Sequence, residues 1–224
     1  MKLKEEDGFR LNPDDLEKLI TKNTKAILIN SPHNPTGAIM TEAEIKKVYE
    51  IAKKHDVWLI SDEVYGRIVF SDNRTMFSSP SVYDKCLERT VIIHSFSKSY
   101  AMTGWRIGAV TAPTSLIIRM RLLLETIASC VSPFIQKAAE EAIGSNQDEI
   151  DAMVNTFRAR RDLLHSLLLD LPLIQAMKPE GAFYTFVNIK DTGLTDIEFS
   201  EKLLQQHGVA TCPGSYFGDG GIGY

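Results

Sequence analysis

Short apolar runs recur along the first half of the chain, and amphipathic segments precede, separate and follow them. The runs are rich in β-branched residues and show little polar alternation, which is typical of strands covered on both faces of a sheet. They are AILIN (26–30), VWLIS (57–61), VIIHSFS (91–97) and RIGAVTA (106–112). Strands that alternate with helices predict an α/β fold with a mostly parallel sheet flanked by helices.

Helices are predicted where apolar residues recur at helical spacing. This spacing marks segment 41–55, and Thr41 with Glu44 forms a capping box at its start. A short helix is expected over 12–22, and further helical structure in the 113–143 region. Segment 12–22 precedes the first apolar run, segment 41–55 separates the first two, and region 113–143 follows the last one.

The pattern changes near residue 148, where the chain is expected to enter a second unit. The expected elements are a long amphipathic helix (148–170), an alternating strand AFYTFVNI (182–189), a capped helix (195–208) and another strand that starts with VATC (209–212). We therefore expect a large domain over residues 1–150 and a smaller α+β domain over 151–224.

Composition narrows the class of protein. The chain has 224 residues, 44% of them hydrophobic and 24% charged, with a formal net charge of −4. This indicates a globular protein with no electrostatic reason to bind nucleic acid or an anionic membrane. The sequence shows no secretory signal and no membrane span. Three widely spaced cysteines without a C-x-x-C pair predict free thiols and a cytoplasmic location.

Polar residues gather where the predicted strands end, which is where ligands bind to open parallel sheets. They are Asn34 after the first run, Asp62 and Tyr65 after the second, Ser95 and Lys98 at the end of the third, and Arg106 at the start of the fourth. Taken singly, each has a structural explanation as a turn, cap, packing or surface residue. His33 and His94 flank this region without a metal-ligand spacing, so no metal is predicted.

Taken together, these side chains match the needs of pyridoxal phosphate. This cofactor requires a lysine for a Schiff base and a carboxylate against its pyridine nitrogen. A nearby carboxylate keeps that nitrogen protonated, because an opposite charge favours the charged form. Hydroxyl and amide donors can hold the ring oxygen, and an arginine suits the phosphate.

Three motifs resemble those of the fold type I pyridoxal-phosphate-dependent aminotransferases of class I and II, and they occur in the same order. They are SPHNPTG (31–37), SDEVYG (61–66) and SFSKSYAMTGWRIG (95–108). The motifs are most similar to the aspartate and aromatic aminotransferase branch. The resemblance implies that Lys98 carries the Schiff base and acts as the base of the proton shift. It also implies that Asp62 pairs with the pyridine nitrogen, Asn34 and Tyr65 with the ring oxygen, and Ser95 and Arg106 with the phosphate.

The same resemblance implies a transferase that moves an amino group between an amino acid and a 2-oxo acid, and a homodimer whose subunits share their sites. It implies that family members are longer than this chain at both ends. The preceding part would hold a phosphate-binding loop and a ring-stacking aromatic, and an arginine for the substrate carboxylate would follow residue 224. Phe183 and Tyr184 resemble the family strand that enters near the substrate, with plain packing as the alternative.

Other functions remain open at the level of sequence. A pyridoxal-phosphate-dependent lyase shares the fold and the motifs, because fold does not fix the chemistry. A non-catalytic remnant domain is an alternative for this chain alone. The stretch 95–98 also fits S-x-x-K of serine acyl-transfer enzymes, but SDN (71–73) precedes it and no K-T-G occurs.

Overall fold

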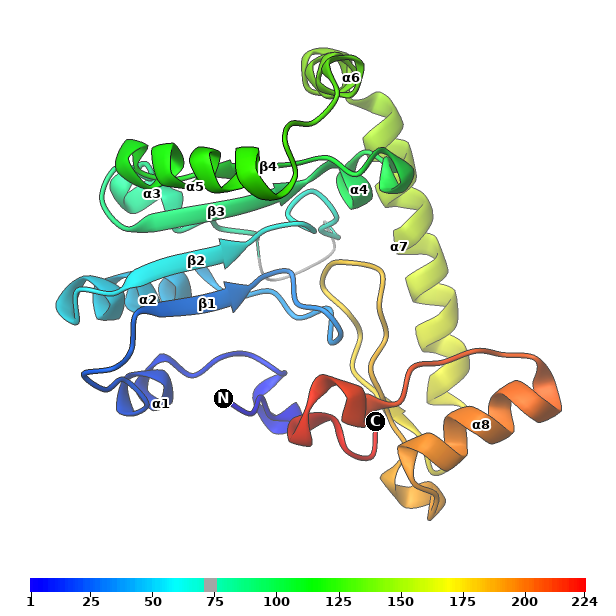
Figure 1. The fold of residues 1–224 in the computed structure, drawn as a ribbon. Coiled ribbons are helices and arrows are strands. Elements are labelled where there is room, and N and C mark those ends of the chain that lie inside the picture. Colours follow the sequence, from blue (N-terminus) through cyan, green and yellow to red (C-terminus); the bar gives the residue numbers. More distant parts are fainter. Residues whose placement is uncertain (71–75) are drawn as a thin grey trace.

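The computed structural model describes residues 1–70 and 76–224, so the SDN tripeptide at 71–73 lies outside the described residues. Its main sheet has four strands in the order β1-β2-β3-β4 (Figure 1). They are β1 (Ala26–Asn30), β2 (Trp58–Asp62), β3 (Thr90–Ser95) and β4 (Gly108–Thr111). Strands β1, β2 and β3 are parallel, and β4 is antiparallel to β3. The mostly parallel sheet expected from the sequence is confirmed.

The antiparallel direction of β4 follows from the short connection before it. That connection holds only α4 (Phe96–Ser99) and a 3₁₀ turn, Thr103–Trp105. A parallel connection needs a crossover, usually with a full helix, which this segment cannot supply. Strand β4 also begins later than the apolar run suggested, because Arg106 adopts a left-handed backbone with φ of 51° and so cannot extend the strand.

The helices between residues 13 and 144 lie around the main sheet and extend beyond it. They are α1 (Pro13–Lys18), α2 (Glu42–Lys54), α3 (Ser81–Asp84), α5 (Thr114–Ile127) and α6 (Pro133–Gly144). The capping box is confirmed at α2, where Thr41 Oγ1 accepts from Glu44 N at 3.2 Å and Glu44 Oε2 accepts from Thr41 N at 2.6 Å. Helix α1 ends at Lys18, four residues earlier than the sequence pattern suggested.

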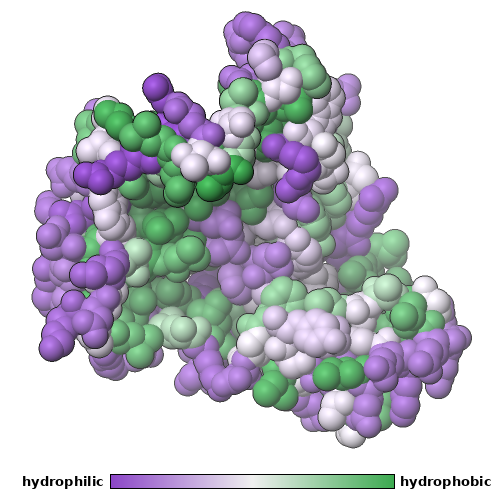
Figure 2. Space-filling model, in the orientation of Figure 1, coloured by the Kyte–Doolittle hydropathy of each residue, from purple (hydrophilic) through white to green (hydrophobic). Residues whose placement is uncertain are grey.

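One face of the sheet forms the main core and the other stays partly open. Ile27 and Leu59 lie against α2, where Val48 is fully buried. On the opposite face, Leu28 is 66% exposed, and Leu122 on α5 is 59% exposed. Figure 2 shows hydrophobic surface in the hollow beneath α5. Apolar surface of this extent is typical of a face that another chain segment or protein covers.

The last third of the chain forms a smaller layer beside the sheet. Its elements are α7 (Asp148–Leu169), β5 (Gln175–Ala176), β6 (Val187–Asn188) and α8 (Asp196–His207), with β5 and β6 antiparallel (Figure 1). The capped helix is confirmed: Thr195 and Glu198 form a capping box, and Gly208 ends α8 in a left-handed conformation. Helix α7 begins two residues before the expected boundary at 150, and the division into two domains stays a prediction.

Two strand expectations differ from the structure. Of the predicted strand 182–189, only β6 is paired in the two-stranded sheet. The predicted strand that starts with VATC (209–212) is wrong, because this segment has no strand structure and Val209 is 48% exposed. An apolar tetrapeptide becomes a strand only beside a partner strand, and none pairs with it among the described residues.

Segment 179–182 joins parts of the chain that are distant in sequence. Glu180 N and Gly181 N both donate to Gly37 O at 2.9 Å, and Ala182 N donates to Ile68 O at 2.8 Å. A Cβ on Gly181 would lie 2.8 Å from Ile68 O, so this close approach requires glycine. The segment therefore fixes the position of the residues that follow it, Phe183 and Tyr184. Within the described ranges, no helix is long and apolar enough to cross a membrane.

Candidate active site

The strand register brings the predicted site residues to one edge of the sheet. Asn30 is paired with Asp62, and Asp62 is paired with Ile93, two residues before Ser95. Side chains strengthen this alignment, because Asn30 Nδ2 donates to Asp62 O at 3.1 Å. The carboxyl ends of β1, β2 and β3 therefore meet, and the residues that follow them share one region of the surface.

Asn34 lies in the loop after β1, which Asn30 also holds. Asn30 Oδ1 accepts from Asn34 N at 2.8 Å. The Asn34 side chain is exposed and lines a cavity of about 450 Å³, together with His33 and Thr36. His33 Nδ1 lies 2.8 Å from Thr36 Oγ1, and burial lowers the pKa of the His33 imidazole to about 4. The loop is thus fixed by neutral hydrogen bonds.

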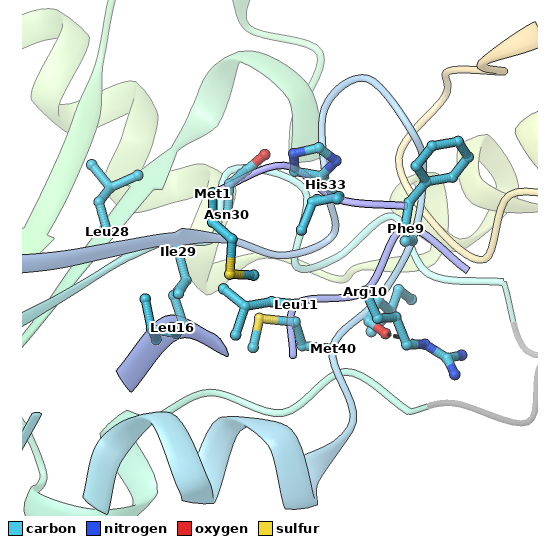
Figure 3. Close-up of a pocket in the computed structure, with 13 residues that line it drawn as sticks. Met1, Phe9, Arg10, Leu11, Leu16, Leu28, Ile29, Asn30, His33 and Met40 are labelled. Carbon is cyan, nitrogen blue, oxygen red and sulfur yellow. Dashed lines mark hydrogen bonds between the residues drawn. The ribbon is translucent and has the colours of Figure 1, made fainter. Parts of the chain in front are cut away.

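His33 also borders a second cavity, of about 240 Å³. Figure 3 shows the His33 ring at the rim of this cavity, which apolar side chains such as Leu11 and Met40 line. Its walls come from the N-terminal segment, β1 and the residues that lead into α2. Such a lining offers few polar groups to orient a ligand.

Two acidic residues follow each other at the end of β2 in different surroundings. Asp62 is half-buried, and its Oδ1 accepts from Val64 N at 3.1 Å. Glu63 is 4% exposed, and its Oε1 accepts from the hydroxyls of Ser61 and Ser79 at 3.1 and 2.7 Å. Burial raises the pKa of the Glu63 carboxyl. Asp62 is therefore the carboxylate that a ligand at this edge can reach.

Tyr65 and Lys98 meet around one aromatic ring. The Phe183 ring centroid lies 5.5 Å from Lys98 Nζ and 5.3 Å from the Tyr65 ring, with the two rings edge to face. On α7, Phe157 stacks on Phe183 at 5.3 Å and supports it. Phe183 thus provides an apolar wall on which a phenol and a half-buried ammonium group lie close together.

The Tyr65 hydroxyl is hydrogen-bonded to the hydroxyl of Tyr184. Tyr65 is 3% exposed, and burial is the main reason that its pKa lies above the usual value for tyrosine. The charge of Asp62 raises it further. Asp62, Tyr65 and Lys98 thus form one group of side chains, with Tyr65 as a protonated hydrogen-bond donor at neutral pH.

Ser95 and Arg106 lie at the junction of β3 and β4. Ser95 is paired with Gly108, and its Oγ accepts from Ser97 N at 3.1 Å at the start of α4. Arg106 is exposed, and its Nη1 donates to Thr103 O at 2.9 Å. The backbone brings both residues to the edge that carries Lys98. Among the described residues, no hydrogen bond joins the two side chains.

Sequence reasoning missed two residues that organise this edge. Asn30 bonds both to the strand that ends at Asp62 and to the loop that carries Asn34. The sequence feature that could have indicated Asn30 was an amide side chain at the last position of an apolar run. Tyr184 was noted only for its segment, and its bond to Tyr65 spans 119 positions. Among residues 1–70 and 76–224, no group of three or more His, Cys, Asp or Glu could hold a metal ion.

The fold and this edge define a mixed α/β sheet with a lysine, a carboxylate and a phenol at the strand ends, and comparison with known proteins gives the family. A model of the family described as aminotransferase class I and II matches residues 1–221. The chain belongs to that family.

Named relatives and solved structures agree. The chain is 43% identical over 222 residues to an aspartate aminotransferase of Pyrococcus abyssi and 40% identical over 222 residues to an aromatic-amino-acid aminotransferase of Thermococcus litoralis, in each case across 98% of this chain and 56% of the relative. The structure of an aromatic aminotransferase from Pyrococcus horikoshii superposes with a TM-score of 0.94 at 42% identity, covering 99% of this chain and 59% of that one. The chain thus spans little more than half the length of these relatives.

Proposed function

We propose that the protein to which this chain belongs is a pyridoxal-phosphate-dependent aminotransferase that moves an amino group between an amino acid and a 2-oxo acid. The observation that carries the proposal is the meeting of Lys98 and Tyr65 on Phe183, with Asp62 on the strand next to the one that leads into Lys98. Membership of the family supports it. When bound, the cofactor supplies an electron sink that makes the substrate α-proton acidic.

The residues of the chain fit this cofactor chemically. Within the described ranges, the Lys98 ammonium has no carboxylate within ion-pair distance, so its amine is not committed to a structural pair. Asp62 uses one carboxylate oxygen for a turn and keeps the other for a ligand. Arg106 uses a single guanidinium N–H for the backbone. A basic amine, an accessible carboxylate and a forked cation match an aldehyde, a pyridine nitrogen and a phosphate.

Each residue has a defined task in this proposal. Lys98 forms the covalent link and moves the α-proton, for which its half-buried position beside Phe183 excludes part of the solvent. Asp62 holds a proton on the pyridine nitrogen through its negative charge. Tyr65 and Asn34 donate to the ring oxygen. Ser95 and Arg106 bind the phosphate, the serine through its hydroxyl and the arginine through paired N–H groups.

The assembly and location of the protein are also part of the proposal. We expect a homodimer, in keeping with the exposed apolar surface of Leu28 and α5. We expect the cytoplasm, because Cys86, Cys130 and Cys212 are all free thiols. Light scattering of the purified protein measures the first. Residue-level thiol labelling in intact cells tests the second, since an oxidising compartment would block the two exposed thiols.

Borohydride trapping tests the covalent link. The purified chain is mixed with pyridoxal phosphate, reduced with borohydride and digested, and the modified peptides are mapped. We expect the label on Lys98, its loss in Lys98→Ala and its retention in the control Lys137→Ala, a lysine exposed on α6. Label scattered over surface lysines, or none, would contradict the assignment of Lys98.

Product analysis tests the reaction class. The protein is given an amino acid with a 2-oxo acid, and the new amino acid and any ammonia are quantified. Transfer predicts a new amino acid in proportion to the donor consumed, without ammonia. Ammonia or an eliminated side chain would indicate a lyase of the same fold instead.

A further inference from the structure

Tyr184 contacts the group around Lys98 from the other half of the chain. Its hydroxyl is hydrogen-bonded to the Tyr65 hydroxyl, and its ring lies 5.5 Å from the Tyr65 ring at 81°. Among the described residues, Tyr184 Oη is the only hydrogen-bond partner of Tyr65 Oη. The position of the Tyr65 proton therefore depends on Tyr184.

A count of protons shows what the pair can do. Two phenols carry two hydroxyl protons, and one hydrogen bond between them uses one. The second proton is available for a third acceptor. If Tyr184 donates to Tyr65 Oη, then the Tyr65 proton points away from Tyr184 and toward a ligand. If Tyr65 donates to Tyr184 instead, the Tyr65 proton is not available to the ligand, and the Tyr184 hydroxyl would have to reach the ligand.

The backbone before Tyr184 is held rigidly, which suits a positioning role. Phe70 N donates to Glu180 O at 3.0 Å, and Val69 bridges to Gly181. Together with the bonds of Gly37 and Ile68 described above, these contacts fix segment 179–182 on both sides. Tyr184 follows two residues after Ala182, which is fully buried. The backbone that carries Tyr184 thus has little conformational freedom, so its hydroxyl is held in position beside Tyr65.

We propose that Tyr184 is a positioning residue that donates to Tyr65 Oη and so directs the Tyr65 proton to the ring oxygen of the bound cofactor. The inference rests on the proposed function for the role of the ring oxygen, but the pairing itself does not. Tyr184 has no task in the function proposed above. Removal of its hydroxyl leaves Tyr65 in place and takes away the partner that fixes its proton.

Within residues 1–70 and 76–224, the charged and titratable groups around Tyr65 are few. Asp62 precedes it on the same turn, Lys98 lies across Phe183, and Tyr184 contacts it directly. Burial is the main cause that raises the pKa of Tyr65, and the charge of Asp62 adds to it. Because a hydroxyl that donates to Tyr65 Oη stabilises the Tyr65 phenolate, loss of the Tyr184 hydroxyl raises the pKa of Tyr65 in the cofactor-free chain.

The first test uses the cofactor-free chain labelled with 3,5-difluorotyrosine, whose acidic phenol titrates in an accessible pH range. The Tyr65 fluorine signal is assigned by its loss in Tyr65→Phe. We expect its titration midpoint to rise by about half to one pH unit in Tyr184→Phe, because a hydroxyl that donates to Tyr65 Oη stabilises the Tyr65 phenolate and one hydrogen bond is worth about this much. Tyr216→Phe is the matched control, because Tyr216 is 71% exposed. An unchanged or lower midpoint in Tyr184→Phe would overturn the inference.

The second test follows the visible absorption of the bound cofactor against pH. A hydrogen bond to the ring oxygen withdraws negative charge from it and weakens its hold on the proton of the Lys98 linkage. We expect the midpoint to rise in Tyr65→Phe and to rise by a smaller amount in Tyr184→Phe. The double variant should match Tyr65→Phe alone, because Tyr184 acts only through Tyr65.

These outcomes separate the inference from the proposed function. Additive shifts in the double variant, or no shift in Tyr184→Phe, overturn the inference while a labelled Lys98 upholds the function. An unlabelled Lys98 refutes the function, and the fluorine titration then decides the pairing on its own. Phenylalanine keeps the ring contacts with Tyr65 and Phe183, and a thermal melt of each variant checks that the fold persists.

Discussion

The imidazole of His33 should make the loop before Asn34 sensitive to acid. Burial lowers the pKa of His33 from 6.5 to about 4 in the folded chain. In the unfolded chain the imidazole takes up a proton near its ordinary value. Between these two values the unfolded state binds more protons than the native state, so the free energy of unfolding falls as pH falls through this window.

The magnitude follows from the size of the shift. A difference of one pKa unit corresponds to about 1.4 kcal/mol, so the full window corresponds to about 3 kcal/mol as an upper value. Solvent at the rim of the two cavities reduces it, because His33 is only partly buried. We expect His33 to account for a loss of about 1 to 3 kcal/mol between pH 6.5 and pH 4.

Urea unfolding of the chain and of His33→Gln at both pH values measures this loss. Glutamine retains a polar atom for Thr36 Oγ1 but cannot be protonated. Burial also lowers the pKa of His94 and His165, so both proteins should lose stability in acid. The variant should lose less, by the amount assigned to His33. Equal losses in the two proteins would refute the reasoning.

Three further predictions concern the fold and the site. Gly181→Ala should lower the free energy of unfolding by about 1 to 3 kcal/mol, because the added Cβ would lie 2.8 Å from Ile68 O. In the helical control Gly144→Ala the added Cβ meets nothing within 4 Å, so this variant should not be destabilised. Urea unfolding of the two variants measures the difference. Thr41→Ala should lower the free energy of unfolding by about 1 kcal/mol because it removes the cap of α2, and Thr195→Ala should lower it by a similar amount at α8. A thermal melt of each variant measures the loss, and no loss would contradict the role of the capping boxes. Asp62→Asn should keep the borohydride label on Lys98 while turnover falls, because a neutral amide does not hold a proton on the pyridine nitrogen, and unchanged turnover would contradict the role of Asp62.

Local patterns predicted the elements that local physics determines. Strand β1 has the bounds that its apolar run indicated, and both capping boxes form because their donors and acceptors lie within one turn. The order of chemical groups along the chain also placed Asp62 and Ser95 at strand ends, since parallel neighbours end at the same edge, whereas Lys98 lies in the short helix α4 that follows β3. Their roles toward a cofactor remain predictions.

Other features depended on contacts between distant parts of the chain. Nothing within residues 209–212 indicates the absence of a partner strand, and nothing near Tyr65 indicates Tyr184. The left-handed backbone of Arg106 is likewise set by the turn before it, and it shortened β4. A period of two or of 3.6 residues describes which face is buried, but not which segment covers it.

The bonds of segment 179–182 have a consequence for the order in which the molecule can be built. The carbonyl groups of Gly37 and Ile68 accept hydrogen bonds from residues more than a hundred positions later in the chain, so these contacts close a long loop. Any fragment that ends before Gly181 lacks the clamp on the Asn34 loop and the phenol beside Tyr65. During synthesis the sheet can pair early, whereas the edge that carries Lys98 is completed only when the second half of the chain has arrived.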